Sequence, residues 1–528
     1  MAKKELLSSG KVKNLELRRD VTVWGSFMWG YADVGADIYA ALGLVMAAAQ
    51  GGTSLAFALA GIVYILIGLV YTELASAYPV AGGGQYFTLR GLGDFWGFIT
   101  GAALLLDYTI CIALFAVASA GYINFFLPQT FVEQFIVNFG IFKQVNLFWC
   151  AESLAIIGLL VWLNIRGIRE SSLFNEIIGI VDIVTESGLI ILGFLFAWKP
   201  ELFVHQWKTE FPTLDNFMYG SSLAIISFVG LESISQAAQE TKRPATIIPR
   251  TSLTLIFTVF IFAQAFSTLG LGLLPWQDFA AREGDPVAKL ASVIPYIGLI
   301  AGPFAALLGA TILTISANSG IMSASRLTFS MSQFNLIGKW FNKVSAKYRT
   351  PARTIIVFSA IAALETVLSF LTPRAMDTLA NMYAFGATTG YILVFIAFFK
   401  LRRKDPYAPR PYKVPFNIKV KIKGKKVELP LLGFLGILGV STILFEVILT
   451  HPIGRVAGPV WIILCFIYYA VYRRTNGLPV FGSVQRNWEE DQIKVLTSAE
   501  EFDLLEQYKI ALAERDEDKR KEKNVKIY

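Results

Sequence analysis

The chain has 528 residues, of which 55% are hydrophobic and 16% are charged, and its mean hydropathy is +0.54. Soluble domains carry about 25% charged residues, so this composition excludes an ordinary water-soluble protein and indicates a membrane protein. The three cysteines are odd in number and widely spaced, which excludes a disulfide framework and a metal site built from them.

Apolar runs of roughly 20 residues, the length that crosses a bilayer, recur along the chain. Residues 1–20 are basic and polar and are expected to form a cytoplasmic N-terminus rather than a removed signal peptide. Twelve membrane helices are predicted within 21–474, at 21–48, 54–79, 95–127, 148–166, 175–198, 216–240, 250–275, 295–327, 353–372, 376–400, 430–449 and 455–474. Residues 475–528 are expected to form a soluble cytoplasmic tail, where Ser498 and Glu501 have the spacing of a helix capping box.

The positions of lysine and arginine predict the orientation of these spans, because cytoplasmic loops are enriched in both residues. If both termini are cytoplasmic, the outer loops hold only seven of the 47 basic residues, namely Lys143, Lys199, Lys208, Arg282, Lys289, Arg374 and Arg455. The basic segment 400–426 is then an inner connector. The sequence therefore predicts a multi-pass protein of the cytoplasmic membrane, in contact with the lipid bilayer, whose charge of +8 needs no nucleic-acid partner.

Two predicted spans contain glycine and acidic residues well inside their apolar runs. The first span holds Asp33 and Asp37 on either side of Gly35, and the sixth holds Gly230 and Glu232. Irregular backbone at membrane depth is tolerated only where it lines a cavity, so interrupted spans indicate a binding site. These spans open two groups of five. Because five is odd, the second group is expected to be inverted, so that the interruptions face each other.

Four segments, in chain order, resemble the amino acid–polyamine–organocation superfamily of secondary transporters across nearly all of residues 20–475. They are ADVGADIYAALG in the first span, ELASAYPVAGGGQYFTLRGLGDFWGFITGAALLLDY (73–108), FVGLESISQAAQETKRPATIIPRTS (228–252) and ANSGIMSASRLTFSMSQFNLIGKWF (317–341). The resemblance implies an all-α integral membrane protein of the LeuT type. Its parts would be two inverted five-helix repeats, at about 21–198 and 216–400, and two extra helices within 430–474.

The same resemblance implies a secondary active transporter, without a cofactor, that moves an amino acid or related amine by alternating access, with proton coupling or by exchange. Potassium uptake is the alternative, because potassium transporters of the superfamily have an aspartate and a tyrosine in the opening helix. Asp33 and Tyr39 are similar to that pair but one residue too close. A membrane-embedded enzyme or sensor is the third hypothesis. The sequence shows neither a catalytic set nor a signalling domain, so we expect no enzyme.

The resemblance places the cargo site at the two interruptions. We expect cargo contacts from Tyr31, Asp33, Gly35, Ala36, Asp37, Tyr39, Tyr108, Phe228, Gly230 and Glu232. The half-helix that starts after Gly35 carries partial positive charge at its N-terminus, where amino-acid members hold the substrate carboxylate. Asp37 departs from the small neutral residues usual there and would compete with that carboxylate. Capping of the half-helix is its alternative role.

Candidates for the coupling ion or proton lie on the fifth and eighth spans. Asp182 and Glu186 lie one helical turn apart on the fifth span, which has no lysine of the kind that many proton-coupled members carry. On the eighth span, Ser316 and Asn318 offer oxygen atoms in the region that faces a cation site in sodium-coupled relatives. Buried hydrogen bonding and helix packing are the alternative roles of these residues.

Overall fold

A computed structural model describes residues 22–139, 142–166, 171–236, 238, 241–282, 284–345, 348, 350–422 and 425–525. The predicted N-terminal segment 1–20 lies outside these residues. Within the described chain, eleven helical stretches are long and apolar enough to cross a membrane. The protein is therefore predominantly helical and multi-pass, as the apolar runs predict.

The first stretch, Val23–Ala77, covers both of the first two predicted spans. It contains α2 (Val23–Val34), α3 (Asp37–Ala49), the short helix η1 (Gln50–Gly52) and α4 (Thr53–Ala77). The predicted division between residues 48 and 54 coincides with η1. Because two predicted spans are joined in this one stretch, the described chain has eleven apolar stretches where twelve spans were predicted.

The other long helices begin and end within a few residues of the predicted spans, except that the sixth span is divided among α11, η2 and α12. They are α6 (Asp94–Asn124), α8 (Leu147–Arg166), α9 (Ser171–Phe196), α11 (Leu214–Ala224), η2 (Ile225–Phe228), α12 (Glu232–Gln236), α13 (Pro244–Leu273), α16 (Gly298–Gln333), α17 (Ala352–Phe370), α18 (Ala375–Lys404), α19 (Leu431–Thr450) and α20 (Gly454–Thr475). Their length and apolar composition satisfy both the bilayer thickness and the backbone hydrogen bonds.

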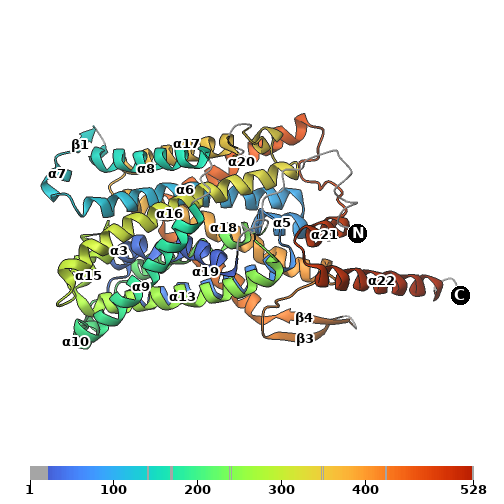
Figure 1. The fold of residues 1–528 in the computed structure, drawn as a ribbon, viewed down its shortest axis with the longest axis horizontal. Helices are drawn as coiled ribbons and strands as arrows, with labels where there is room; N and C mark the ends of the chain where they lie inside the picture. The colour runs from blue at the N-terminus through green and yellow to red at the C-terminus, as the bar shows by residue number, and fades with distance from the viewer. Residues whose placement is uncertain are drawn as a thin grey trace.

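Shorter elements connect the spans and gather at two opposite ends of the molecule (Figure 1). One end carries α5 (Gly84–Leu92), the hairpin of β3 (Asn417–Ile422) and β4 (Lys425–Pro430), α21 (Trp488–Ser498) and α22 (Phe502–Val525). The other end carries α7 (Gln129–Glu133), the hairpin of β1 (Ile136–Phe139) and β2 (Phe142–Asn146), α10 (Pro200–Thr209) and α15 (Pro286–Ser292). Two further connectors are α14 (Trp276–Ala280) and η4 (Lys339–Asn342), and Gly338 just before η4 bonds to Tyr468 of α20. The basic segment and the tail thus share one end, and the predicted outer loops share the other.

The helix α6 lies at the centre of the packing, and the apolar window of its span is 100% buried. Two glycines allow neighbouring helices to approach its backbone. A β-carbon on Gly320 of α16 would lie 3.0 Å from the carbonyl oxygen of Tyr108. One on Gly386 of α18 would lie 3.0 Å from the amide nitrogen of Asp107. These close approaches hold Asp107 and Tyr108 in the middle of the helical bundle.

The tail forms two helices, and the predicted capping box is wrong. Ser498 is the last residue of α21, and its hydroxyl donates to the carbonyl of Val495 at 3.0 Å instead of capping a following helix. The next helix begins only at Phe502. Glu501 is buried and lies 3.7 Å from the guanidinium of Arg243, just before α13. The motif has the right spacing, but a turn separates it from the helix it was expected to open.

Candidate functional site

The first interruption separates α2 from α3 by only two residues, Gly35 and Ala36. The amide of Gly35 still donates to the carbonyl of Tyr31 at 2.7 Å, and the amide of Tyr39 turns to the carbonyl of Ala36 at 3.0 Å. The hydroxyl of Ser316 in α16 donates to the carbonyl of Ala32 at 2.8 Å. A side chain from another span therefore satisfies backbone that leaves the regular helical pattern, as irregular chain at membrane depth requires.

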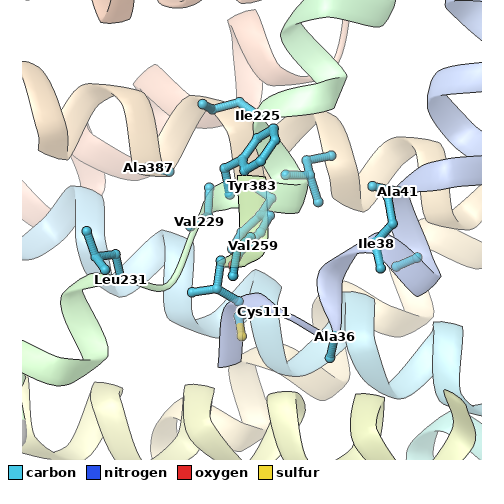
Figure 2. Packing of buried hydrophobic residues seen from close by; sticks show 14 of the residues in the cluster. Ala36, Ile38, Ala41, Cys111, Ile225, Val229, Leu231, Val259, Tyr383 and Ala387 are labelled. Atoms are coloured by element: carbon cyan, nitrogen blue, oxygen red, sulfur yellow. The ribbon is translucent and has the colours of Figure 1, made fainter. Parts of the chain in front are cut away.

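The second interruption is more open. After η2, Val229 is extended, and Gly230 has a φ of +114°, a conformation that favours glycine because it has no β-carbon. The amide of Ser233 then donates to the carbonyl of Gly230 at 2.9 Å as α12 begins at Glu232. Figure 2 shows this extended chain at Val229 and Leu231, together with the turn of the first interruption at Ala36.

The two interruptions touch. A β-carbon on Gly230 would lie 3.0 Å from the Oδ2 atom of Asp33 and 3.1 Å from a methyl group of Val34. Segments about two hundred residues apart in the sequence thus meet where each loses regular helical structure. The sequence-based expectation that the interruptions face each other agrees with this contact.

Four buried carboxyl groups surround this contact, and we refer to Asp33, Asp37, Asp107 and Glu232 as the four-carboxyl cluster. Their exposed fractions range from 0% for Asp37 to 6% for Asp33. Asp37 interacts electrostatically with the other three members. Glu232 accepts a hydrogen bond from the hydroxyl of Tyr391 at 2.9 Å. Among the described residues, the charged groups that act on these carboxyls are other carboxyls of the cluster.

Asp37 does not cap α3. Ala36 occupies the N-cap position, and no side-chain capping bond is present. Within the described chain, no protein group forms a hydrogen bond with either carboxylate oxygen of Asp37, whereas Asp107 and Glu232 lie close enough to share one. The alternative role of Asp37 as a helix cap is therefore wrong.

Aromatic side chains lie beside the cluster. Phe228 stacks on the ring of Tyr64 in α4, with ring centroids 5.1 Å apart. Tyr108 accepts a hydrogen bond from the side-chain amide of Gln236 at 3.0 Å, and Gln236 in turn accepts from the amide of Gly82 at 2.9 Å. Gln236 of α12 thus connects the predicted cargo contact Tyr108 of α6 to the glycine-rich turn before α5.

The predicted coupling acids bind the tyrosines of the first span. Tyr39 donates its hydroxyl to Asp182 at 2.8 Å, and Tyr31 donates to Glu186. Since Tyr31 belongs to α2 and Tyr39 to α3, the helix α9 holds both halves of the interrupted span. Two residues expected at the cargo therefore bond with the coupling candidates.

The structure does not bring Ser316 and Asn318 together. Ser316 faces the carbonyls of α2, whereas Asn318 accepts a hydrogen bond from Asn164 of α8 at 2.5 Å. The two residues are separated by two positions in a helix and point to different neighbours. Of this pair, only Ser316 lies at the interruption.

Sequence reasoning missed the tyrosines Tyr64, Tyr71 and Tyr391. All three are buried in spans, and Tyr71 packs edge-on against Tyr391 with centroids 5.7 Å apart. Aromatic residues in an apolar span are read as core or lipid-facing. No local signal in the sequence distinguishes these three from the other tyrosines of the spans.

Comparison with known proteins shows where the chain is similar. The family model described as amino acid permease matches residues 22–471. The branched-chain amino acid permease BcaP of Bacillus subtilis is 26% identical over 471 residues, which cover 87% of this chain and 94% of that protein. The low-affinity putrescine importer PlaP of Escherichia coli is 26% identical, covering 88% and 96%. The gamma-aminobutyric acid permease of Bacillus subtilis is 24% identical, covering 70% and 77%.

Proposed function

The chain belongs to the amino acid permease family, and on that premise we propose that it moves an amino acid or related amine across the cytoplasmic membrane by alternating access. As a member of a transporter family, it is not an enzyme. The observation that carries the proposal is the contact between Gly230 and Asp33, where two interrupted spans meet. Transport proteins use such interruptions to expose backbone and polar groups to a cargo near mid-membrane.

The charge of the site supports a cargo with a positive group. Isolated carboxylates in a low-dielectric interior are costly, and a proton or an opposite charge relieves that cost. The described chain supplies carboxyls and hydroxyls around Asp33 and Glu232, while the charged neighbours of these two are acids. An ammonium group on the cargo provides the missing positive charge and three hydrogen-bond donors.

For coupling, we assign proton binding to Asp182 and Glu186. An ionised carboxylate accepts a stronger hydrogen bond than a protonated one, by roughly a factor of two for charge-assisted bonds. Protonation of Asp182 would therefore loosen its hold on Tyr39 in α3, and protonation of Glu186 would do the same for Tyr31 in α2. Since those helices flank the first interruption, proton binding on α9 would change how rigidly the cargo site is held.

We further propose that the chain crosses the membrane twelve times in a LeuT-type arrangement of two inverted repeats, with α2 and α3 together forming one interrupted span. The end that carries α21, α22 and the β3–β4 hairpin is assigned to the cytoplasm, because the densest basic segment lies there. Both termini are cytoplasmic in this assignment, residues 475–528 form a soluble tail, and the membrane is the cytoplasmic membrane.

Potassium uptake has no support among these observations. The hydroxyl of Tyr39 donates to Asp182 on α9, whereas the alternative pairs Tyr39 with Asp33 around the ion. The relatives named above are permeases or importers of amino acids or of an amine by their names.

The test is uptake by purified protein in liposomes, with labelled amino acids and amines, with and without an inward proton gradient. We expect saturable uptake of at least one such solute and stronger accumulation when the gradient is present. Uptake of rubidium alone, or of none of these solutes, would contradict the proposed cargo. Uptake that is the same with and without the proton gradient would contradict the role assigned to Asp182 and Glu186.

A further inference from the structure

The chain after α20 turns back over the ends of the spans that are assigned to the cytoplasm, where α21 and α22 lie at the same end as α5 (Figure 1). Arg486 lies 2.5 Å from Asp94, the first residue of α6. It also donates to the carbonyl of Phe334, just after α16, at 2.9 Å. One side chain before α21 thus anchors the tail to both α6 and α16.

The helix α21 then places a buried polar side chain between two further elements. Gln492 donates its amide to the carbonyl of Ala77, the last residue of α4, at 2.9 Å and accepts from the guanidinium of Arg90 in α5 at 2.8 Å. Trp488, one turn earlier, packs edge-on against Tyr86 of α5 with centroids 6.1 Å apart. Because buried polar groups need their partners, these bonds fix α21 in one position against α4 and α5.

A second contact lies at the start of α22. Glu501 is buried and lies 3.7 Å from the guanidinium of Arg243. Its carboxylate also forms hydrogen bonds with the amides of Ala245 and Thr246, in the first turn of α13. The amides and the dipole of a helix N-terminus stabilise a carboxylate in this position, so the tail also binds α13.

These bonds connect two groups of helices that pack around the cargo site. Gly30 of α2 packs against Leu255 of α13, and Gly68 of α4 packs against Ile256 of the same helix, so α2, α4 and α13 form one group. Gly320 of α16 approaches the backbone of α6, and these two helices form the other. Alternating access moves one group of helices against another around a fixed site. The tail is bonded to α4 and α13 in the first group and to α6 and α16 in the second.

The elements beneath the tail separate the cargo site from the cytoplasmic end. Gln236 of α12 bonds both to Tyr108, beside the four-carboxyl cluster, and to Gly82 in the turn before α5. Residues 78–91, which include this turn and most of α5, are all buried. A continuous series of contacts therefore runs from the cargo site through α12 and α5 to α21. Cargo that leaves on this side has to displace α5 or α12, and α21 holds α5 in place.

We propose that residues 488–503, which we call the tail latch, are autoinhibitory. Bound as in this structure, they hold the cytoplasmic side of the cargo site closed, and they must leave α4, α5 and α13 before that side opens. This inference rests on the proposed alternating-access transport and adds a regulatory contact to it. Since only the unlatched fraction of the protein completes the transport cycle, weakening the latch should increase the rate of transport.

The rate of uptake by Gln492→Ala tests the proposal. Purified full-length protein in liposomes is given labelled leucine, 4-aminobutyrate or putrescine. Loss of two buried hydrogen bonds, one of them to a charged group, favours the unlatched state by roughly tenfold, so the initial rate should rise by up to about tenfold. Lys494→Ala is the matched control, because Lys494 lies on the exposed side of the same helix, and it should keep the wild-type rate.

Hydrogen–deuterium exchange of the same proteins gives a readout that needs no cargo. In Gln492→Ala, exchange at residues 78–92 should rise at least about tenfold, because the latch no longer protects α5. Exchange in α10, at the opposite end of the molecule, should not change. Equal increases at both ends would indicate general destabilisation and would overturn the latch.

Glu501→Ala removes the second contact and should also increase the rate of uptake. This variant decides the question if size-exclusion chromatography shows that Gln492→Ala does not fold. Uptake by a folded latch variant that is equal to or slower than that of the wild-type protein would overturn the latch and leave the transport function intact. Uptake of none of the three solutes by any of the proteins would contradict the proposed function instead. In that case unchanged exchange at residues 78–92 would overturn the latch, and a selective increase there would support it.

Discussion

A β-carbon on Gly230 would lie 3.0 Å from the Oδ2 atom of Asp33, so a side chain at position 230 would have to displace the carboxylate of Asp33. The φ of Gly230, +114°, also strains every residue that has a β-carbon. We expect Gly230→Ala to cost about 1–3 kcal/mol in backbone strain and to displace Asp33, which should abolish uptake. Thermal unfolding in detergent and liposome uptake measure the two effects.

The control for that variant is Gly158→Ala in α8, where an added β-carbon meets no atom within 4 Å. Alanine in an open helical position stabilises by about 1 kcal/mol or less, so this variant should keep its uptake and have an unfolding midpoint equal to or slightly above that of the wild-type protein. Full activity in Gly230→Ala would show that the contact between the interruptions is not needed for transport.

The hydrogen bonds of α9 lead to a second prediction. Tyr39 and Asp182 are 2.8 Å apart, and Asp182→Asn removes both the titrating group and the charge-assisted bond. We expect this variant to lose accumulation driven by a proton gradient while it still exchanges labelled for unlabelled cargo. Glu446→Gln, at an acid of α19 outside the four-carboxyl cluster and away from α9, should retain both activities. Gradient-driven accumulation in Asp182→Asn would assign the proton to another group.

The third prediction concerns the stability of the fold, and it rests on a buried ion cluster at the start of α6. Asp94, the first residue of α6, lies 3.0 Å from a guanidinium nitrogen of Arg473 and 2.5 Å from one of Arg486, and both Asp94 and Arg473 are fully buried. Removal of one partner leaves buried charge without compensation, which costs about 3–5 kcal/mol. Asp94→Asn should therefore lower the unfolding midpoint strongly.

For comparison, Glu490 pairs with Lys494 on the exposed surface of α21. Because solvent screens such a pair, Glu490→Gln should leave the unfolding midpoint unchanged. Equal midpoints for Asp94→Asn and the wild-type protein would mean that the tail and α20 do not depend on this cluster.

The spans and their interruptions could be predicted because the bilayer imposes a length and a composition that are visible in single segments. Glycine and acidic residues inside an apolar run, as at Gly35 and Glu232, are equally local signals. The contact of Tyr39 with Asp182 could not be predicted in this way, since the two residues are 143 positions apart and any packing of α9 could have paired them differently.

The expected cation site on the eighth span also shows that tertiary contacts cannot be predicted from local sequence. Ser316 and Asn318 lie two positions apart in the sequence, yet the helix directs them to α2 and α8 respectively. Ser498 and Glu501 have the spacing of a capping box, but the spacing alone does not reveal that a helix ends at Ser498. In both cases the sequence shows the residue types, but the neighbour that each side chain contacts depends on the tertiary structure and cannot be predicted from spacing alone.

His451 predicts how stability depends on pH. It lies between α19 and α20, is fully buried beside Ser222, and burial lowers its pKa from 6.5 to about 4. The unfolded chain binds a proton at this residue below pH 6.5, whereas the folded protein binds it only near pH 4. Stability from this group is therefore complete above pH 6.5 and falls by about 3 kcal/mol as the pH drops to 4. Over this pH range, the unfolding midpoint should fall less steeply in His451→Gln than in the wild-type protein. The control His205→Gln, which changes the other histidine, should behave like the wild type. Parallel curves for all three proteins would contradict the role given to His451.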